Sequence, residues 1–166
     1  YRGPLQQNWF ELHDGLKNSQ YIFETTKKGT VAFVGGSITG MPWRKKVMKN
    51  LEGRYPSTEF TFILAGVGST GTMYGSFRLD RDVIQKGKVD LLFEEAAVND
   101  VSIGRTADQT VRGMEGIVRR ARRANPDIDI VMMHFACTDK LADYENGKTP
   151  QVIQSFDKVA KYYGVP

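Results

Sequence analysis

The stretch Val31-Ala32-Phe33-Val34-Gly35-Gly36-Ser37-Ile38-Thr39-Gly40 decides the fold. Its first four residues are apolar, and three of them are β-branched or aromatic, which is typical of a short buried strand. Two glycines and a serine follow, and a helical segment begins a few residues later. A strand that ends in glycines and leads into a helix places the residue at the turn on the edge of the sheet, where open α/β sheets bind ligands. The helix N-terminus behind Ser37 favours negative charge, which suits a reactive serine and equally a serine that contacts a phosphate.

Apolar runs later in the chain follow the same pattern. They predict further buried strands at residues 60–65, 89–96 and 128–135. Apolar residues at helical spacing predict amphipathic helices over residues 42–54, 73–84, 106–124 and 150–163. Strands that alternate with helices indicate a parallel sheet with helices on both faces, so we predict a three-layer α/β/α fold of flavodoxin-like type. Because Val165-Pro166 stands where a fifth strand should begin, we expect the C-terminal end of this fold to be missing.

The chain divides into two predicted parts. Residues 1–30 form an N-terminal lead-in segment, in which Lys17 to Gln20 predict a turn and Tyr21 to Phe23 predict a short strand. Residues 31–166 form the α/β domain. With 166 residues, of which 40% are apolar and 25% charged, the chain is long enough for one globular domain with its own core.

The formal net charge of +4 is mild, and part of it comes from one predicted helix. A basic cluster can indicate an anionic partner. We favour a solvated helix face, because no aromatic side chains interleave with the arginines as nucleic-acid stacking would require. We therefore expect no nucleic-acid partner. The cluster consists of Arg112, Arg119, Arg120, Arg122 and Arg123.

Several classes of protein are excluded by what the sequence lacks. Cys137 is the one cysteine, so no disulfide can form within the chain, and no Cys/His cluster has the spacing of a zinc site. The first loop, Gly35-Gly36-Ser37, is not Gly-x-Gly-x-x-Gly, and no P-loop of the form Gly-x-x-x-x-Gly-Lys-Ser/Thr is present. We therefore expect no cofactor and no metal, and a flavodoxin-like or nucleotide-binding domain ranks last. No apolar run approaches about 20 residues, so no membrane span is expected. The chain starts at Tyr1 and not at Met, which leaves the compartment open, and a secreted or periplasmic protein whose targeting segment was removed is one option.

Three loops follow three successive predicted strands and hold residues suited to chemistry. They contain Ser37, the glycine-rich segment 66–71, and Asn99-Asp100. Because the carboxyl ends of parallel strands share one edge, these residues can converge. A serine can act as a nucleophile, glycine-rich backbone offers N–H groups, and an asparagine side chain offers a neutral donor, which together meet the needs of acyl transfer. Considered alone, Ser37 is better explained as a helix cap, and only the second and third loops favour its role as a nucleophile.

The same loops resemble the sequence blocks of the SGNH, or GDSL-like, hydrolases. The first block of that family is usually Gly-Asp-Ser, and this chain has Gly35-Gly36-Ser37. The second block places a glycine after the second strand, as in residues 65–71. The third block, Gly-x-Asn-Asp, is similar to Ala97-Val98-Asn99-Asp100. The blocks occur in the family's order, and the resemblance covers residues 31–166.

The resemblance implies a serine-dependent carboxyl-ester hydrolase that works through an acyl-enzyme. Ser37 would attack the ester carbonyl. The backbone N–H groups of Ser37 and of Gly68, or of Ser69 in its place, would hold the oxyanion together with the Asn99 side chain. Asp100 would brace its loop. Similar bacterial proteins often deacylate carbohydrates, so the expected substrate is a small-molecule or carbohydrate ester, with a sugar acetyl ester as the first candidate.

The chain departs from the family pattern at two places. Gly36 replaces the usual aspartate, and the Asp-x-x-His block that supplies the general base is absent. His134 lies near the end of the fourth predicted strand, but we favour a structural or pocket-lining role for it, and His13 lies in the polar lead-in. The adjacent Glu94 and Glu95 must face opposite sides of a strand, so at least one is expected beneath a helix, in a structural role or bracing a loop near the site.

A second interpretation is a non-catalytic module on the same fold. The loss of the aspartate and of the histidine block would then be functional losses, and the pocket would only bind a glycan or an acyl group. The sequence does not distinguish the two interpretations, nor does it give the oligomeric state or the acyl group and alcohol of the substrate.

Overall fold

The computed structural model describes residues 10–166, and residues 1–9 of the predicted lead-in lie outside the described part. Its centre is a four-stranded sheet in the order β2-β1-β3-β4, in which every neighbouring pair is parallel. The predicted parallel sheet is therefore confirmed. The strands are β1 (Lys28–Gly35), β2 (Glu59–Gly66), β3 (Leu91–Glu95) and β4 (Asp129–Met132).

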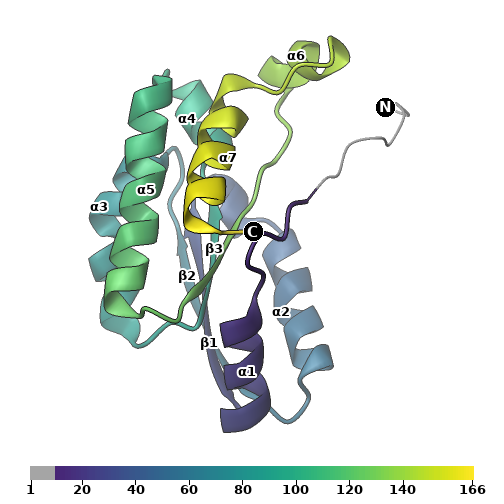
Figure 1. Ribbon diagram of the computed structural model, residues 1–166, viewed down its shortest axis with the longest axis vertical. Helices are drawn as coiled ribbons and strands as arrows, with labels where there is room; N and C mark the ends of the chain where they lie inside the picture. Colours follow the sequence, from purple (N-terminus) through teal and green to yellow (C-terminus); the bar gives the residue numbers. More distant parts are fainter. Residues whose placement is uncertain (1–9) are drawn as a thin grey trace.

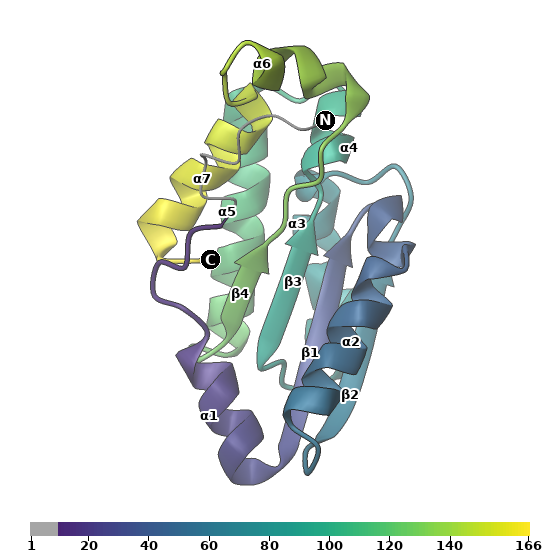
Figure 2. The ribbon, with the colours of Figure 1, turned by 90° about the vertical axis from the view of Figure 1, so that its right-hand side faces the viewer.

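Helices cover both faces of the sheet. They are α1 (Lys17–Thr26), α2 (Trp43–Arg54), α3 (Thr72–Asp82), α4 (Ala97–Ser102), α5 (Ala107–Ala124), α6 (Leu141–Glu145) and α7 (Gln151–Tyr163), with 3-10 turns η1 (Ser37–Gly40), η2 (Ile84–Lys86) and η3 (Thr138–Lys140). Helices α1 and α2 pack on one face, and α3, α5 and α7 pack on the other (Figures 1 and 2). The three-layer prediction is confirmed.

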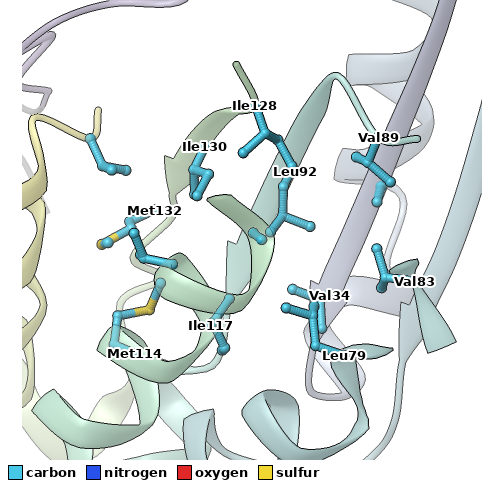
Figure 3. Packing of buried hydrophobic residues seen from close by; sticks show 14 of the residues in the cluster. Val34, Leu79, Val83, Val89, Leu92, Met114, Ile117, Ile128, Ile130 and Met132 are labelled. Atoms are coloured by element: carbon cyan, nitrogen blue, oxygen red, sulfur yellow. The ribbon is translucent and has the colours of Figure 1, made fainter. Parts of the chain in front are cut away.

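Strand β1 lies at the centre of the core because other strands flank it and helices cover both of its faces. Its residues 31–34 are no more than 1% exposed. Alternate side chains enter different clusters: Ala32 and Val34 face α3, α5 and α7, whereas Val31 and Phe33 face α1 and α2. Figure 3 shows the first cluster, with side chains of the sheet packed against α5. This two-sided burial explains why the strand is a continuous apolar run.

Helices α3 and α5 approach each other closely at two glycines. A Cβ atom on Gly113 would lie 2.2 Å from the Thr72 hydroxyl oxygen, and one on Gly116 would lie 2.4 Å from the Ser76 hydroxyl oxygen. The start of α5 is fixed by a capping box, in which the side chains of Thr106 and Gln109 each accept a hydrogen bond from the other's backbone N–H. Helices α3 and α5 therefore pack with their backbones close together, and neither glycine leaves room for a side chain.

The predicted turn and strand within residues 17–23 are wrong, because these residues belong to helix α1. Two contacts hold the helix on the sheet. The backbone N–H and the hydroxyl of Ser19 both donate to the Asp129 carboxylate at 2.7 Å, at the start of β4. Phe23 is 1% exposed and packs edge-on against Phe60 and Tyr55. Long-range contacts therefore override a local sequence that is poor in strong helix formers.

The last residues of the chain lie alongside β4. The N–H of Met132 donates to the carbonyl oxygen of Pro166 at 2.8 Å, and Val165 is 1% exposed. Gly164 ends α7 in the left-handed conformation, as its sequence position predicts. Within the described residues, no helix is both long and apolar enough to span a bilayer.

The predicted arginine cluster lies on α5, and three of its members have partners. Arg120 pairs with Asp80 at 2.6 Å, Arg122 donates to the carbonyl oxygen of Tyr163 at 2.8 Å, and Arg119 lies 3.8 Å from Glu115. These contacts fit a solvated helix face, which is the interpretation favoured from the sequence.

Glu94 is the most unusual residue of the core. Its register partners are Val34 on β1 and Met132 on β4, and its side chain is fully buried on the face covered by α5 and α7. Neither carboxyl oxygen has a hydrogen-bond partner among the described residues. Burial, with a smaller contribution from the nearby Glu95 and Asp100, raises the pKa of Glu94 well above its ordinary value. The carboxyl group is thus accommodated in its neutral form.

We expect Glu94→Gln to be more stable than the wild type above neutral pH. Between the ordinary glutamate pKa of 4.5 and the raised folded-state pKa, the folded protein keeps a proton that the unfolded chain has lost. The wild-type free energy of unfolding therefore falls as pH rises, by up to about 1.4 kcal/mol per pH unit from this group. Urea denaturation at several pH values between about 5 and about 8 measures the effect.

The exposed Glu52 in α2 provides the control, since Glu52→Gln removes the same charge from a solvated site. The stability difference between Glu94→Gln and wild type should grow with pH, whereas that of Glu52→Gln should stay near zero. A difference for Glu94→Gln that does not change with pH would contradict the expectation.

Candidate functional site

The turn after β1 places Ser37 on the edge of the sheet where the strands end. Ser37 is the first residue of η1 and is exposed. No side-chain hydrogen bond caps η1, so the geometry does not support the interpretation of Ser37 as a helix cap. The Ser37 side chain is thus exposed at the start of η1 and caps no helix. Its hydroxyl is therefore available to a ligand.

The two glycines before Ser37 are required by close contacts. A Cβ atom on Gly35 would lie 1.7 Å from the carbonyl oxygen of Glu95 at the end of β3. A Cβ atom on Gly36 would lie 1.8 Å from the Oδ1 atom of Asn99 and 3.3 Å from its Nδ2 atom. Gly36 thus leaves the space that the Asn99 side chain occupies. This explains in physical terms why this chain accommodates no larger residue at position 36 without moving Asn99.

Asn99 lies in α4, the short helix that follows β3. Its side chain is 9% exposed, and its Oδ1 atom has no hydrogen-bond partner among the described residues. The neighbouring Asp100 accepts the backbone N–H of Thr72 at 2.9 Å and its hydroxyl at 2.7 Å. Asp100 therefore braces the start of α3, whereas the sequence predicts that it braces its own loop. Burial raises the pKa of Asp100, and the hydrogen bonds from Thr72 act in the opposite direction.

The glycine-rich loop between β2 and α3 passes beside Ser37. A Cβ atom on Gly68 would lie 4.0 Å from the Cβ atom of Ser37, which is ordinary contact distance. The loop is tied to the serine turn because the N–H of Val67 donates to the carbonyl oxygen of Gly35 at 3.0 Å. Within the loop, the Thr70 hydroxyl donates to the carbonyl oxygen of Val67 at 2.7 Å. The sequence predicts that Ser37, Gly68 and Asn99 converge, and the structure places Gly68 beside Ser37 and the Asn99 side chain against Gly36, the residue before Ser37.

Glu95 lies directly beneath this turn. Burial raises its pKa to about 7, against the effect of the nearby Thr39 hydroxyl and Gly36 N–H, which favour the charged form. Its carboxyl oxygens make no hydrogen bond of regular geometry among residues 10–166. Glu94 and Glu95 therefore face opposite sides of β3, as predicted, and Glu95 is the one close to the serine turn.

Neither described histidine contacts Ser37. The ring of His134 packs edge-on against Phe156 at 5.1 Å, and its Nε2 atom lies 3.6 Å from the Asp157 carboxylate, on α7. His13 lies 3.2 Å from Glu11. In the described part of the chain, no group of three or more His, Cys, Asp or Glu side chains is arranged to hold a metal ion.

Two residues near the turn were missed by sequence reasoning. The indole N–H of Trp43 donates to the carbonyl oxygen of Ile38 at 2.7 Å and anchors η1 to α2. The guanidinium of Arg78 donates to the carbonyl oxygen of Gly35 at 2.9 Å. The sequence shows Arg78 only as a charged residue within a predicted amphipathic helix. Helical spacing does not predict that its side chain reaches the carbonyl oxygen of Gly35.

Comparison with known proteins agrees with this geometry. Residues 33–166 match the sequence profile of the GDSL-like Lipase/Acylhydrolase family. One matching crystal structure is of a two-domain esterase active on acetylated mannans, with 25% sequence identity and a TM-score of 0.73. The match covers 96% of this chain but only 41% of the length of that esterase. No curated protein matches the chain.

Two further crystal structures share the fold at lower identity. TesA is 17% identical, with a TM-score of 0.67 over 82% of this chain and 75% of its own. A variant of an acetyl xylan esterase from Geobacillus stearothermophilus is 17% identical, with a TM-score of 0.63 over 84% of this chain and 76% of its own. The resemblance to the SGNH hydrolases is therefore confirmed, and because the profile match spans most of the chain, the protein belongs to the GDSL-like lipase/acylhydrolase family.

Proposed function

We propose that the protein is a serine esterase that removes acetyl groups from carbohydrates through an acyl-enzyme. The observation that supports this best is the convergence of Ser37, Gly68 and the Asn99 side chain at one sheet edge. A nucleophile with hydrogen-bond donors on two further loops is what attack on an ester carbonyl requires. The family membership of the chain agrees with this chemistry.

The oxyanion would be held by neutral donors. In the proposed mechanism, the Ser37 hydroxyl oxygen attacks the carbonyl carbon, and the carbonyl oxygen becomes negatively charged. The backbone N–H groups of Ser37 and Gly68, with the Asn99 Nδ2 group, would donate to that oxygen. Asn99 is well suited because its side chain is buried and held against Gly36, so little reorganisation is needed as charge develops.

The proton of Ser37 needs an acceptor, because a neutral serine is a weak nucleophile. In family members an Asp-x-x-His block supplies it, and the 166 residues contain no such block. Glu95 is not a substitute, since it is buried beneath the turn, where no contact with the Ser37 hydroxyl exists in the described residues. The proposed reaction therefore uses a histidine that is neither His13 nor His134.

The substrate proposal rests on similarity. One matching structure is of an esterase active on acetylated mannans, and the same esterase was crystallised with mannopentaose. A carbohydrate acetyl ester fits the exposed position of Ser37, because an open site admits a sugar chain. The alternative is a non-catalytic module on the same fold that binds a glycan or an acyl group.

One prediction of the proposed function concerns Ser37. A fluorophosphonate probe should label the full-length protein at Ser37, and Ser37→Ala should lower acetate release from acetylated mannan by about a thousandfold or more. The matched control is Ser57→Ala, an exposed serine before β2, which should retain labelling and activity. A full-length protein that is neither labelled nor active would support the binding module instead. Labelling without acetate release would contradict only the proposed substrate.

Another prediction of the proposed function concerns the space next to Gly36. Gly36→Ala adds one carbon atom that would displace the Asn99 side chain, so kcat should fall by about tenfold or more, as it should in Asn99→Ala. Gly40→Ala is the control, because a Cβ atom there has nothing within 4 Å.

A double-mutant cycle makes this prediction sharper. If Gly36→Ala acts by displacing Asn99, the double variant Gly36→Ala/Asn99→Ala should be no slower than Asn99→Ala alone. Losses that multiply would show that residue 36 acts independently of Asn99.

A further inference from the structure

Arg78 reaches from α3 to the end of β1. Its Nη2 atom donates to the carbonyl oxygen of Gly35 at 2.9 Å, although the two residues are 43 positions apart. The side chain is 9% exposed, so this contact is made away from bulk water. A hydrogen bond from a charged group in such surroundings is stronger than an ordinary backbone bond.

The same carbonyl oxygen is the junction of the serine turn with the glycine-rich loop. It also accepts the N–H of Val67 at 3.0 Å, and the Thr70 hydroxyl lies 3.4 Å away. On the other side of the same peptide group, the N–H of Gly36 donates to the carbonyl oxygen of Glu95 at 3.1 Å. The peptide between Gly35 and Gly36 is thus held at both ends, one residue before Ser37.

Asp82 fixes the position of the Arg78 guanidinium. Its Oδ2 atom accepts Nη1 of Arg78 at 3.0 Å, one helical turn further along α3. Hydrogen bonds, first from Arg81 and then from Arg78, lower the pKa of Asp82 to about 2, so it is charged at neutral pH. The exposed Arg81 also pairs with Asp82, at 2.6 Å, but is not bonded to the serine turn.

From this geometry we propose that Arg78 is a positioning residue, which holds the Gly35 carbonyl group and thereby the placement of Ser37 relative to the loop that contains Gly68. The proposal rests on the proposed function of Ser37. With Arg78 in place, the serine turn, the glycine-rich loop and α3 form one rigid unit. Without it, the Gly35 carbonyl group keeps only the neutral donors of Val67 and Thr70, and the hydrogen bond between the serine turn and α3 is lost. The expected consequence is a slower chemical step with unchanged substrate binding.

The test compares two arginines that share one partner. In the full-length protein, Arg78→Ala should lower kcat by about tenfold or more while KM stays within about twofold. The rate of Ser37 labelling at saturating fluorophosphonate should fall by the same factor. Arg81→Ala also removes a partner of Asp82, and it should leave both rates unchanged. Millimolar guanidinium ion should partly restore kcat in Arg78→Ala and have no such effect on Arg81→Ala.

Arg78→Lys separates positioning from general stability. It keeps the charge, but a single ammonium group cannot reproduce the two directed contacts to Gly35 and Asp82, so kcat should fall by a smaller factor than in Arg78→Ala. Melting temperatures ensure that every variant is assayed while folded. If Arg78→Ala does not fold, Arg78→Lys decides the question by the same comparison of kcat with KM.

The inference is overturned if the folded Arg78 variants have kcat within about twofold of Arg81→Ala, or if KM alone changes. That result would leave the proposed function intact, because the wild type would still be labelled at Ser37. An unlabelled and inactive wild type would instead remove the proposed function and this inference together.

Discussion

The close approach of the backbones of β1 and β3 at Gly35 is the constraint on which the site depends. There is no room for a side chain at this point, since a Cβ atom would lie 1.7 Å from the carbonyl oxygen of Glu95. The peptide that follows donates to that same carbonyl oxygen at 3.1 Å, and its own carbonyl oxygen accepts from Val67 and Arg78. The direction in which the chain leaves β1 is therefore set by two neighbouring segments of the sheet edge, and Ser37 is delivered to a fixed place. The buried apolar run of β1 keeps this end from shifting along the sheet.

Buried acidic groups are associated with this edge. Glu94, Glu95 and Asp100 lie within seven consecutive residues at the end of β3 and the start of α4, and burial raises the pKa of all three carboxyl groups. Such groups lower stability as pH rises, because the unfolded chain loses their protons more readily than the folded protein does. Asp100 has a clear structural role at the start of α3, whereas Glu95 contacts the serine turn through its backbone carbonyl oxygen, which accepts the N–H of Gly36 at 3.1 Å. Glu94 has no hydrogen-bonding partner among the described residues, and the structure offers no role that offsets its cost.

Much of the fold followed from local patterns, and the parts that did not were decided by contacts distant in sequence. Strand runs such as 31–34 and the helical periodicity of residues 107–124 are strong because burial on one or both faces dictates them. The meeting of Ser37, Gly68 and Asn99 could be predicted because parallel strands share one edge. Helix α1 was not predicted, since its stability comes from contacts distant in sequence. Ser19 bonds to Asp129, which is 110 positions away, and Phe23 packs in the core against Phe60. The reach of Arg78 to Gly35 and the fit of Asn99 against Gly36 depend on side-chain geometry that no spacing rule contains.

In the proposed mechanism, the carbonyl oxygen of the ester that Ser37 attacks would accept hydrogen bonds from donors on three loops. The most direct measurement is a crystal structure of the full-length protein after reaction with a fluorophosphonate. The account predicts a phosphonyl group on the Ser37 oxygen, with its phosphoryl oxygen within about 2.7–3.1 Å of Asn99 Nδ2 and of a backbone nitrogen in the loop of residues 66–71. A phosphoryl oxygen that points to solvent, with Asn99 turned away from it, would contradict the account.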